Sequence, residues 1–183
     1  MINFPIPLLG FAASSGTGKT TLLTQLISLL TNKGIRIAII KHSHHNVELD
    51  NPKKDSYKLR KAGAQQTIIA SPKRTSLIIE HPEQNDSTLE QALSHLKTDS
   101  LDLVLVEGFK FAEFPKIELH RKALNKPYFY PIDKQIIAIA TDHALTKDDL
   151  SKSQNDQLVQ LDINNPDEMS AFIKRTIIDF QAP

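Results

Sequence analysis

Near its N-terminus the chain reads Ala13-Ser14-Ser15-Gly16-Thr17-Gly18-Lys19-Thr20, which approximates the phosphate-binding pattern of a glycine, four residues and Gly-Lys-Ser/Thr. The second half of the pattern is intact, and Ala13 replaces the first glycine. The run Leu8 to Ala13 predicts a short buried strand before the loop. Leucines at helical spacing after the loop predict a helix that ends near Gly34. A strand, a glycine-rich loop and a helix in this order predict an α/β fold.

Such a loop binds phosphate because consecutive backbone N–H groups and the positive end of the helix dipole point inward. We expect the Lys19 ammonium to reach the β- and γ-phosphates and the Thr20 hydroxyl to bind Mg²⁺. The nucleotide-binding candidates are Ser15, Gly16, Thr17, Gly18, Lys19, Thr20 and Thr21. The loop therefore predicts binding of a nucleoside triphosphate with magnesium, and the alternative is a glycine-rich turn that binds nothing.

Apolar runs further along the chain predict the rest of the fold. Strands are expected at residues 35–40, 101–106, 116–120, 135–140 and 158–163. Residues 67–70 and 76–80 fit a hairpin or two short strands with a turn between them. Helices are expected at residues 55–62, after a capping box at Ser87-Thr88-Leu89-Glu90, and from Pro166 onward. Nearly unbroken apolar strands suit a parallel sheet covered on both faces. We expect one domain, residues 1–183, with a doubly wound, mostly parallel sheet of the P-loop NTPase fold.

A magnesium site of this kind needs an acidic residue at the end of a neighbouring buried strand. Glu107 follows the apolar run 103–106 and is expected at the carboxyl edge of the sheet, where ligands gather in open α/β folds. Gly108 beside it would allow a phosphate or water to approach closely. Glu107 is therefore the predicted partner of Thr20 on Mg²⁺ and the one catalytic candidate, and the alternative is a residue that only caps a loop.

A polar segment with several histidines stands just beyond the second predicted strand. It contains Lys41, His42, His44 and His45, with Asp50 close by. The spacing matches no zinc pattern. We therefore favour a contact with phosphate, Mg²⁺ or a second ligand over a transition-metal site, and the alternative is a set of solvated side chains.

The choice of nucleobase is open from the residues alone. The Asn-Lys-x-Asp loop by which G-proteins read guanine is absent. Asp142 follows the strand that ends at Ala140, where its carboxylate could accept hydrogen bonds from guanine N1 and N2. A surface aspartate in a turn is an equally good interpretation, so the residues do not separate GTP from ATP.

The composition excludes several classes of site. The chain has 183 residues, a formal net charge of +1 and no cysteine, which removes disulfides, iron–sulfur clusters and thiol nucleophiles. The chain lacks the strong excess of basic residues that would indicate binding to nucleic acid, and no apolar run is long enough for a membrane span. The N-terminus lacks the pattern of a signal peptide. We therefore expect a cytoplasmic protein that binds neither nucleic acid nor membranes.

Several stretches together resemble the molybdopterin-guanine dinucleotide biosynthesis adapter protein (MobB) family. They are residues 8–24, 40–45, 50–56, 62–64, 102–110 and 115–118, with Arg121. The strings Lys-His-x-His-His and Val-Glu-Gly-Phe-Lys rarely occur together, so the resemblance is specific. It extends from residue 8 to about residue 142.

The resemblance implies a GTP-binding accessory protein, a homodimer with weak GTPase activity at most. It implies action beside the guanylyltransferase that joins GMP to molybdopterin, and it permits a direct contact with molybdopterin. Family roles then fall on Gly16 to Thr21 for the phosphates and on Thr20 and Glu107 for Mg²⁺. Asp50 and the His44-His45 pair become candidates at the same site.

The sequence departs from the family pattern at Lys53, where a glycine is usual, and at Ala13. Ser14 also stands where dimeric P-loop ATPases of the related partitioning type carry an extra lysine, which argues against fast hydrolysis. The alternative function is a small-molecule kinase or ATP-dependent ligase on the same fold. A kinase more often shows an arginine-rich lid over the phosphates, and the basic pairs here are scattered.

Overall fold

The computed structural model describes residues 2–43, 47–81 and 87–181. The chain forms two compact units, one made of Met1–His42 with Thr88–Pro183 and the other of Ser43–Ser87. That the chain folds as a single domain stays a prediction. None of the helices in the described ranges is long and apolar enough to cross a membrane.

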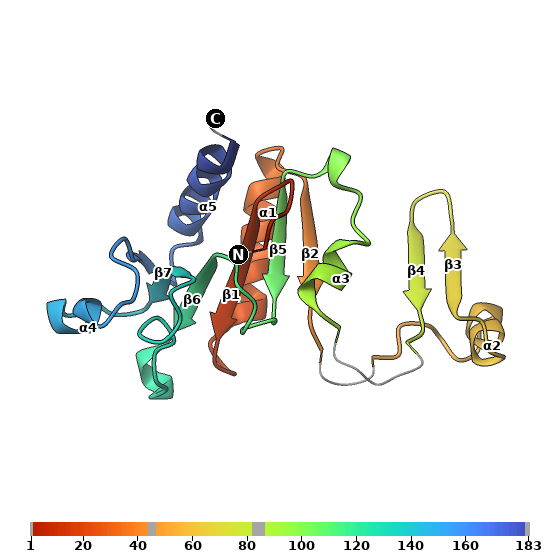
Figure 1. Cartoon of the computed structure of the whole chain (residues 1–183), viewed down its shortest axis with the longest axis horizontal. Coiled ribbons are helices and arrows are strands. Elements are labelled where there is room, and N and C mark those ends of the chain that lie inside the picture. Colours follow the sequence, from red (N-terminus) through yellow and green to blue (C-terminus); the bar gives the residue numbers. More distant parts are fainter. Residues whose placement is uncertain (1, 44–46, 82–86, 182–183) are drawn as a thin grey trace. The chain divides into compact units, whose positions relative to one another are not determined.

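The first unit is built on a six-stranded sheet in which all neighbouring strands are parallel, in the order β2-β5-β1-β6-β7-β8 (Figure 1). The strands are β1 (Leu8–Ala13), β2 (Ile37–Lys41), β5 (Leu103–Glu107), β6 (Lys116–His120), β7 (Ile136–Thr141) and β8 (Val159–Asp162). Because β1 pairs with β5 on one side and β6 on the other, the loops after these three strands meet at one carboxyl edge.

Helices cover both faces of this sheet. On one face, α1 (Lys19–Asn32) and α5 (Pro166–Gln181) pack in a core with Leu9 and Phe11 of β1. On the other face, α3 (Leu89–Leu93) packs with Leu8. Successive side chains of a strand point to opposite faces, so β1 serves both cores. The sheet and its helices confirm the predicted doubly wound α/β fold.

The second unit contains α2 (Asp55–Lys61) and a two-stranded antiparallel sheet of β3 (Gln66–Ala70) and β4 (Thr75–Ile79). The predicted hairpin is therefore confirmed. The buried Arg60 guanidinium forms ion pairs with Glu48 and Glu80, which ties α2 to the segments on either side of it.

Three details differ from the sequence-based expectations. The strand β2 lies at the sheet edge, where Ile39 is 49% exposed, so the expectation of cover on both faces is wrong for it. The capping box begins one residue later than predicted, with Thr88 as the N-cap and Gln91 as its partner. The helix α4 (Lys147–Ser151) was not predicted, because five mostly polar residues show no helical period.

Candidate functional site

The loop after β1 has the backbone shape of a phosphate-binding loop. Gly16 and Gly18 both have left-handed φ angles, 86° and 84°, which residues with a Cβ rarely adopt. Thr17 between them is buried, and its hydroxyl donates to the Ser14 carbonyl oxygen at 3.0 Å. Helix α1 then starts at Lys19, with Gly18 as its N-cap. The structure thus places the free N–H groups of a helix start beside a glycine-rich turn, which is an anion-binding arrangement.

Lys19 and Glu107 lie together at this edge of the sheet. The Lys19 Nζ stands 3.0 Å from a Glu107 carboxylate oxygen, and the two side chains are only 24% and 16% exposed. Thr20 and Thr21 follow in the first turn of α1, and both are exposed. The loop and β5 therefore bring Lys19 and Glu107 together, and Thr20 follows Lys19 in α1. The roles of these residues toward phosphate and magnesium stay predictions.

The turn after Glu107 holds His42 against the end of β5. The His42 N–H donates to the Glu107 carbonyl oxygen at 2.8 Å, and its ring stacks on Phe109 with the centroids 4.3 Å apart. Gly108 has a φ of 96°, and a Cβ there would lie 2.6 Å from the His42 Cβ. Lys41 pairs in register with Glu107. His42 and Lys41 thus neighbour the site, and their contact with phosphate stays a prediction.

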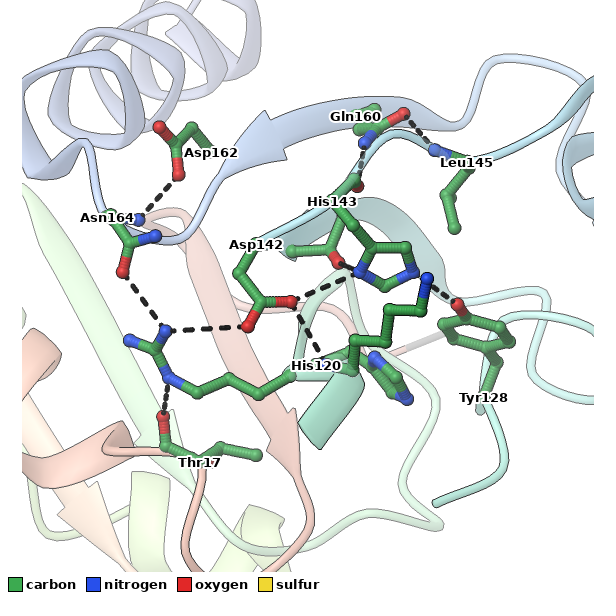
Figure 2. A network of polar contacts seen from close by, with 12 residues as sticks. Thr17, His120, Tyr128, Asp142, His143, Leu145, Gln160, Asp162 and Asn164 are labelled. Atoms are coloured by element: carbon green, nitrogen blue, oxygen red, sulfur yellow. Dashed lines mark hydrogen bonds and ion pairs between the residues drawn. The ribbon is translucent and has the colours of Figure 1, made fainter. Parts of the chain in front are cut away.

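Arg121, directly after β6, connects the phosphate loop to two other strand ends. Its Nε donates to the Thr17 carbonyl oxygen at 3.0 Å and its Nη1 donates to the Asn164 side-chain oxygen at 3.0 Å (Figure 2). Its Nη1 also lies 3.8 Å from an Asp142 carboxylate oxygen. One guanidinium therefore holds together the loops that follow β1, β7 and β8.

Asp142 is engaged by neighbours on the side away from Arg121. The Lys122 N–H donates to its Oδ1 at 3.0 Å, and the His143 Nδ1 lies 3.1 Å from the same oxygen. The hydrogen bond from Lys122, followed by that from His143, lowers the pKa of the Asp142 carboxyl below its ordinary value. The carboxylate stays charged and already accepts protein hydrogen bonds, and its reading of a guanine base stays a prediction.

The remaining predicted site residues lie elsewhere. His44 and His45 fall outside the described residues, and Asp50 belongs to the second unit, where its Oδ1 accepts from the Asn51 N–H at 2.8 Å. Within the described ranges, no group of three or more histidine or acidic residues is arranged to hold a metal ion. The roles of Asp50, His44 and His45 stay predictions.

The sequence analysis missed the network around Arg121, which also includes Tyr128 and His143. The Tyr128 hydroxyl is hydrogen-bonded to the His143 Nε2 at 2.9 Å. The available signal was positional, because Arg121 and His143 closely follow predicted strands whose carboxyl ends lie at the ligand edge. Nothing in the sequence showed that these residues contact one another.

Comparisons with known proteins agree on one family. The profile described as molybdopterin guanine dinucleotide synthesis protein B (MobB) matches residues 8–142. A molybdopterin-guanine dinucleotide biosynthesis adapter protein of Escherichia coli (strain K12) is 47% identical over 169 residues, covering 92% of this chain and 91% of that protein. The Haemophilus influenzae protein of that name is 39% identical over 179 residues, covering 98% of this chain and 94% of that protein. A crystal structure of molybdopterin-guanine biosynthesis protein B superposes with a TM-score of 0.65 at 25% identity, covering 92% of this chain and 98% of that chain.

Proposed function

The chain belongs to the MobB family of molybdopterin guanine dinucleotide synthesis proteins, and we propose that it is a GTP-binding adapter that assists the attachment of GMP to molybdopterin. The observation that carries the nucleotide part is the loop from Ser14 to Thr20, which presents the start of α1 and the Lys19 ammonium next to Glu107. Relatives named as adapters of this biosynthesis support the biological part.

The magnesium ion is proposed to bind between Thr20 and Glu107. Both residues follow the arrangement that P-loop proteins use, with a hydroxyl after the loop lysine and a carboxylate at the end of a neighbouring strand. Both lie at the carboxyl edge of the six-stranded sheet. Mg²⁺ prefers hard oxygen ligands and keeps several waters, so two protein ligands are sufficient.

We propose that GTP hydrolysis is weak. The carboxylate beside the loop lysine is Glu107, which is proposed above to bind Mg²⁺, so it is not available to take a proton from water. Efficient phosphoryl transfer to water also needs a group that positions the nucleophile. A holding site for GTP suits an adapter that works in the cytoplasm beside a guanylyltransferase.

The adapter is proposed to act as a homodimer. In the second unit, Ile68 of β3 and Leu77 of β4 face each other across the hairpin, and they are 65% and 46% exposed. Leu59 on α2 of the same unit is 66% exposed. Exposed apolar residues grouped in this way are typical of surfaces that a partner covers.

Calorimetric titration with GTP and ATP, each with Mg²⁺, tests the nucleotide assignment. We expect GTP to bind more tightly than ATP, and the Lys19→Ala variant to bind GTP about a hundredfold more weakly, because charge-assisted phosphate contacts are lost. Lys174→Ala, an exposed lysine on α5, is the matched control and should bind as the unmodified protein does. Unchanged GTP affinity in Lys19→Ala would refute the loop assignment, and an ATP preference would support a kinase or ligase.

A further inference from the structure

A pocket of about 320 Å³ opens where β6 and β7 end, and none of the described residues that line it belongs to the phosphate loop. The residues that line it include His120, Lys122, Asn125, Lys126, Tyr128 and His143. They come from the last residue of β6 and from the two segments that follow β6 and β7. None of them was assigned to the triphosphate in the proposal above, so the role of this pocket is a separate question.

Aromatic rings form one wall of the pocket. The centroids of the His120 and Tyr128 rings lie 4.2 Å apart, and those of His120 and His143 lie 5.9 Å apart. The Tyr128 hydroxyl bonds to the His143 Nε2, and the His143 Nδ1 bonds to the Thr141 hydroxyl at 2.7 Å. Because these bonds fix the ring orientations, the wall is organised before any ligand arrives. Planar rings stack favourably on such walls.

His120 is a buried polar side chain with unused hydrogen-bonding capacity. Its Nε2–H donates to the Lys126 carbonyl oxygen at 2.9 Å, since a carbonyl can only accept. Its Nδ1 is buried and has no partner among the described residues. A buried acceptor without a hydrogen bond is unfavourable, and a ligand donor that reaches it would remove that cost. The ring N–H group of a bound heterocycle would be such a donor.

The charges at the pocket favour an anion. Lys122 and Lys126 are exposed at its rim, and neither forms an ion pair within the described part of the chain. The acidic residue of the lining, Asp149, is already occupied, because it accepts from the Thr146 hydroxyl at 2.7 Å and lies 3.6 Å from the Lys152 ammonium. The lining therefore carries two lysines without ion pairs to described residues and one carboxylate that already has partners.

We propose that this pocket binds a second ligand, a planar fused heterocycle that carries a phosphate or carboxylate. Guanine mononucleotides and anionic pterins share this chemistry, and their selection as probes rests on the proposed function. Polar contacts connect the phosphate loop to the lining of the pocket: Arg121 contacts Thr17 and Asp142, and Asp142 contacts Lys122 and His143. Figure 2 shows Thr17, Asp142 and His143 within this network. Through this chain of contacts the second ligand lies next to the triphosphate without sharing its site.

Fluorescence titration of the full-length protein with pterin-6-carboxylate, and calorimetry with GMP, test the proposal. Each is measured alone and with a saturating non-hydrolysable GTP analogue and Mg²⁺. We expect at least one probe to bind saturably with the analogue present. Lys126→Glu should weaken that binding by about tenfold or more and leave GTP affinity unchanged, because a charge-assisted contact is replaced by repulsion. Lys174→Glu is the control.

The Tyr128→Phe variant is a second test that is less disruptive to folding, since it removes only the hydroxyl that orients His143. It should also lower the affinity for the probe. Which probe binds identifies the source of the ligand. The proposal is overturned if neither probe binds. It is also overturned if the GTP analogue displaces the probe and Lys126→Glu lowers the affinity for GTP as much as the affinity for the probe. The pocket would then be part of the triphosphate site. Probe binding without any GTP binding would keep this pocket and refute the proposed function.

Discussion

Lys19 and Glu107 show how one contact between two residues links phosphate binding to metal binding. The sequence assigned Lys19 to phosphate and Glu107 to Mg²⁺ as separate roles, yet their charged groups lie 3.0 Å apart. A carboxylate at this distance competes with phosphate for the lysine. Magnesium bound to Glu107 would weaken that competition, because the metal neutralises the carboxylate. The metal then helps GTP binding in two ways, by ligating its oxygens and by releasing Lys19.

This coupling predicts the behaviour of Glu107→Gln. Without the carboxylate, Lys19 is released at every magnesium concentration, so GTP affinity should become insensitive to added Mg²⁺. In the absence of metal, the variant should bind GTP at least as tightly as the unmodified protein. Calorimetric titrations across a magnesium series measure both effects, with Glu90→Gln on the exposed side of α3 as the control. A variant whose GTP affinity still rises with Mg²⁺ would remove Glu107 from the metal site.

Arg121 is a second residue whose role depends on several contacts at once. Its guanidinium donates to Thr17 in the phosphate loop and to Asn164 after β8, which a lysine cannot do with the same geometry. Arg121→Lys should therefore loosen the loop and weaken GTP binding by about tenfold, the effect of one or two lost hydrogen bonds. Calorimetry checks this against Arg175→Lys, an exposed arginine on α5. Equal GTP affinities in the two variants would contradict the proposal that Arg121 holds the phosphate loop in place.

At the scale of single elements, the turn after β5 depends on Gly108. Its positive φ strains any residue with a Cβ, and its contact with His42 leaves no room for one. Gly34 after α1 also has a positive φ, 82°, but nothing lies within 4 Å of a Cβ there. Gly108→Ala should therefore destabilise the protein more than Gly34→Ala, which carries only the backbone cost of about 1–2 kcal/mol. Urea unfolding of both variants measures the difference, and equal losses would show that the close approach to His42 costs nothing.

The strand β6 shows what sequence patterns can and cannot predict about an element. Its alternation of polar and apolar residues gave the correct bounds, but alternation also suggests one exposed face, and all five residues are buried. Two polar members have partners outside the sheet: Lys116 pairs with Asp133, and Glu118 accepts from the backbone of Phe129 and Tyr130. These partners come from a loop without periodicity. The strand was therefore predictable, whereas its burial was not.

Glu118 makes the stability of this strand depend on pH. Burial raises the pKa of its carboxyl from 4.5 to about 7. A raised pKa in the folded state means that the stabilising proton is present at acidic pH and is lost as the pH rises towards 7. The loss is a few kcal/mol at most, at about 1.4 kcal/mol per tenfold change in proton affinity. Urea unfolding should thus show a decline in stability between about pH 5 and pH 7.

The Glu118→Gln variant supplies the control for that decline. Its amide oxygen still accepts a hydrogen bond but carries no charge at any pH, so the decline between pH 5 and pH 7 should disappear. Other titrating groups are common to both proteins, and the difference between the two pH profiles isolates Glu118. Parallel profiles would show that this carboxyl is not the source of the pH dependence.

At the scale of the whole molecule, the sequence predicted the parallel sheet and the loop on its edge because both depend on local patterns. It did not predict the separation of residues 43–87 as a compact unit, because no change of composition marks its ends. The network of Arg121, Asp142 and His143 was also beyond prediction, since its members join strand ends that are distant in sequence. The spacing of apolar residues indicates local helices and strands, whereas contacts between distant segments depend on the order of the strands in the sheet.

The exposed apolar pair on the hairpin leads to a prediction about assembly. Ile68 and Leu77 are cross-strand neighbours, so a partner that covers one also covers the other. If the homodimer uses this surface, Leu77→Lys places a charge in the interface and should convert the dimer into a monomer with an intact fold. Light scattering coupled to size-exclusion chromatography gives the mass, and Ser76→Lys, an exposed position on the opposite face of the same strand, is the matched control. A Leu77→Lys protein that remains dimeric would place the dimer interface elsewhere on the chain, and a monomeric unmodified protein would refute the homodimer itself.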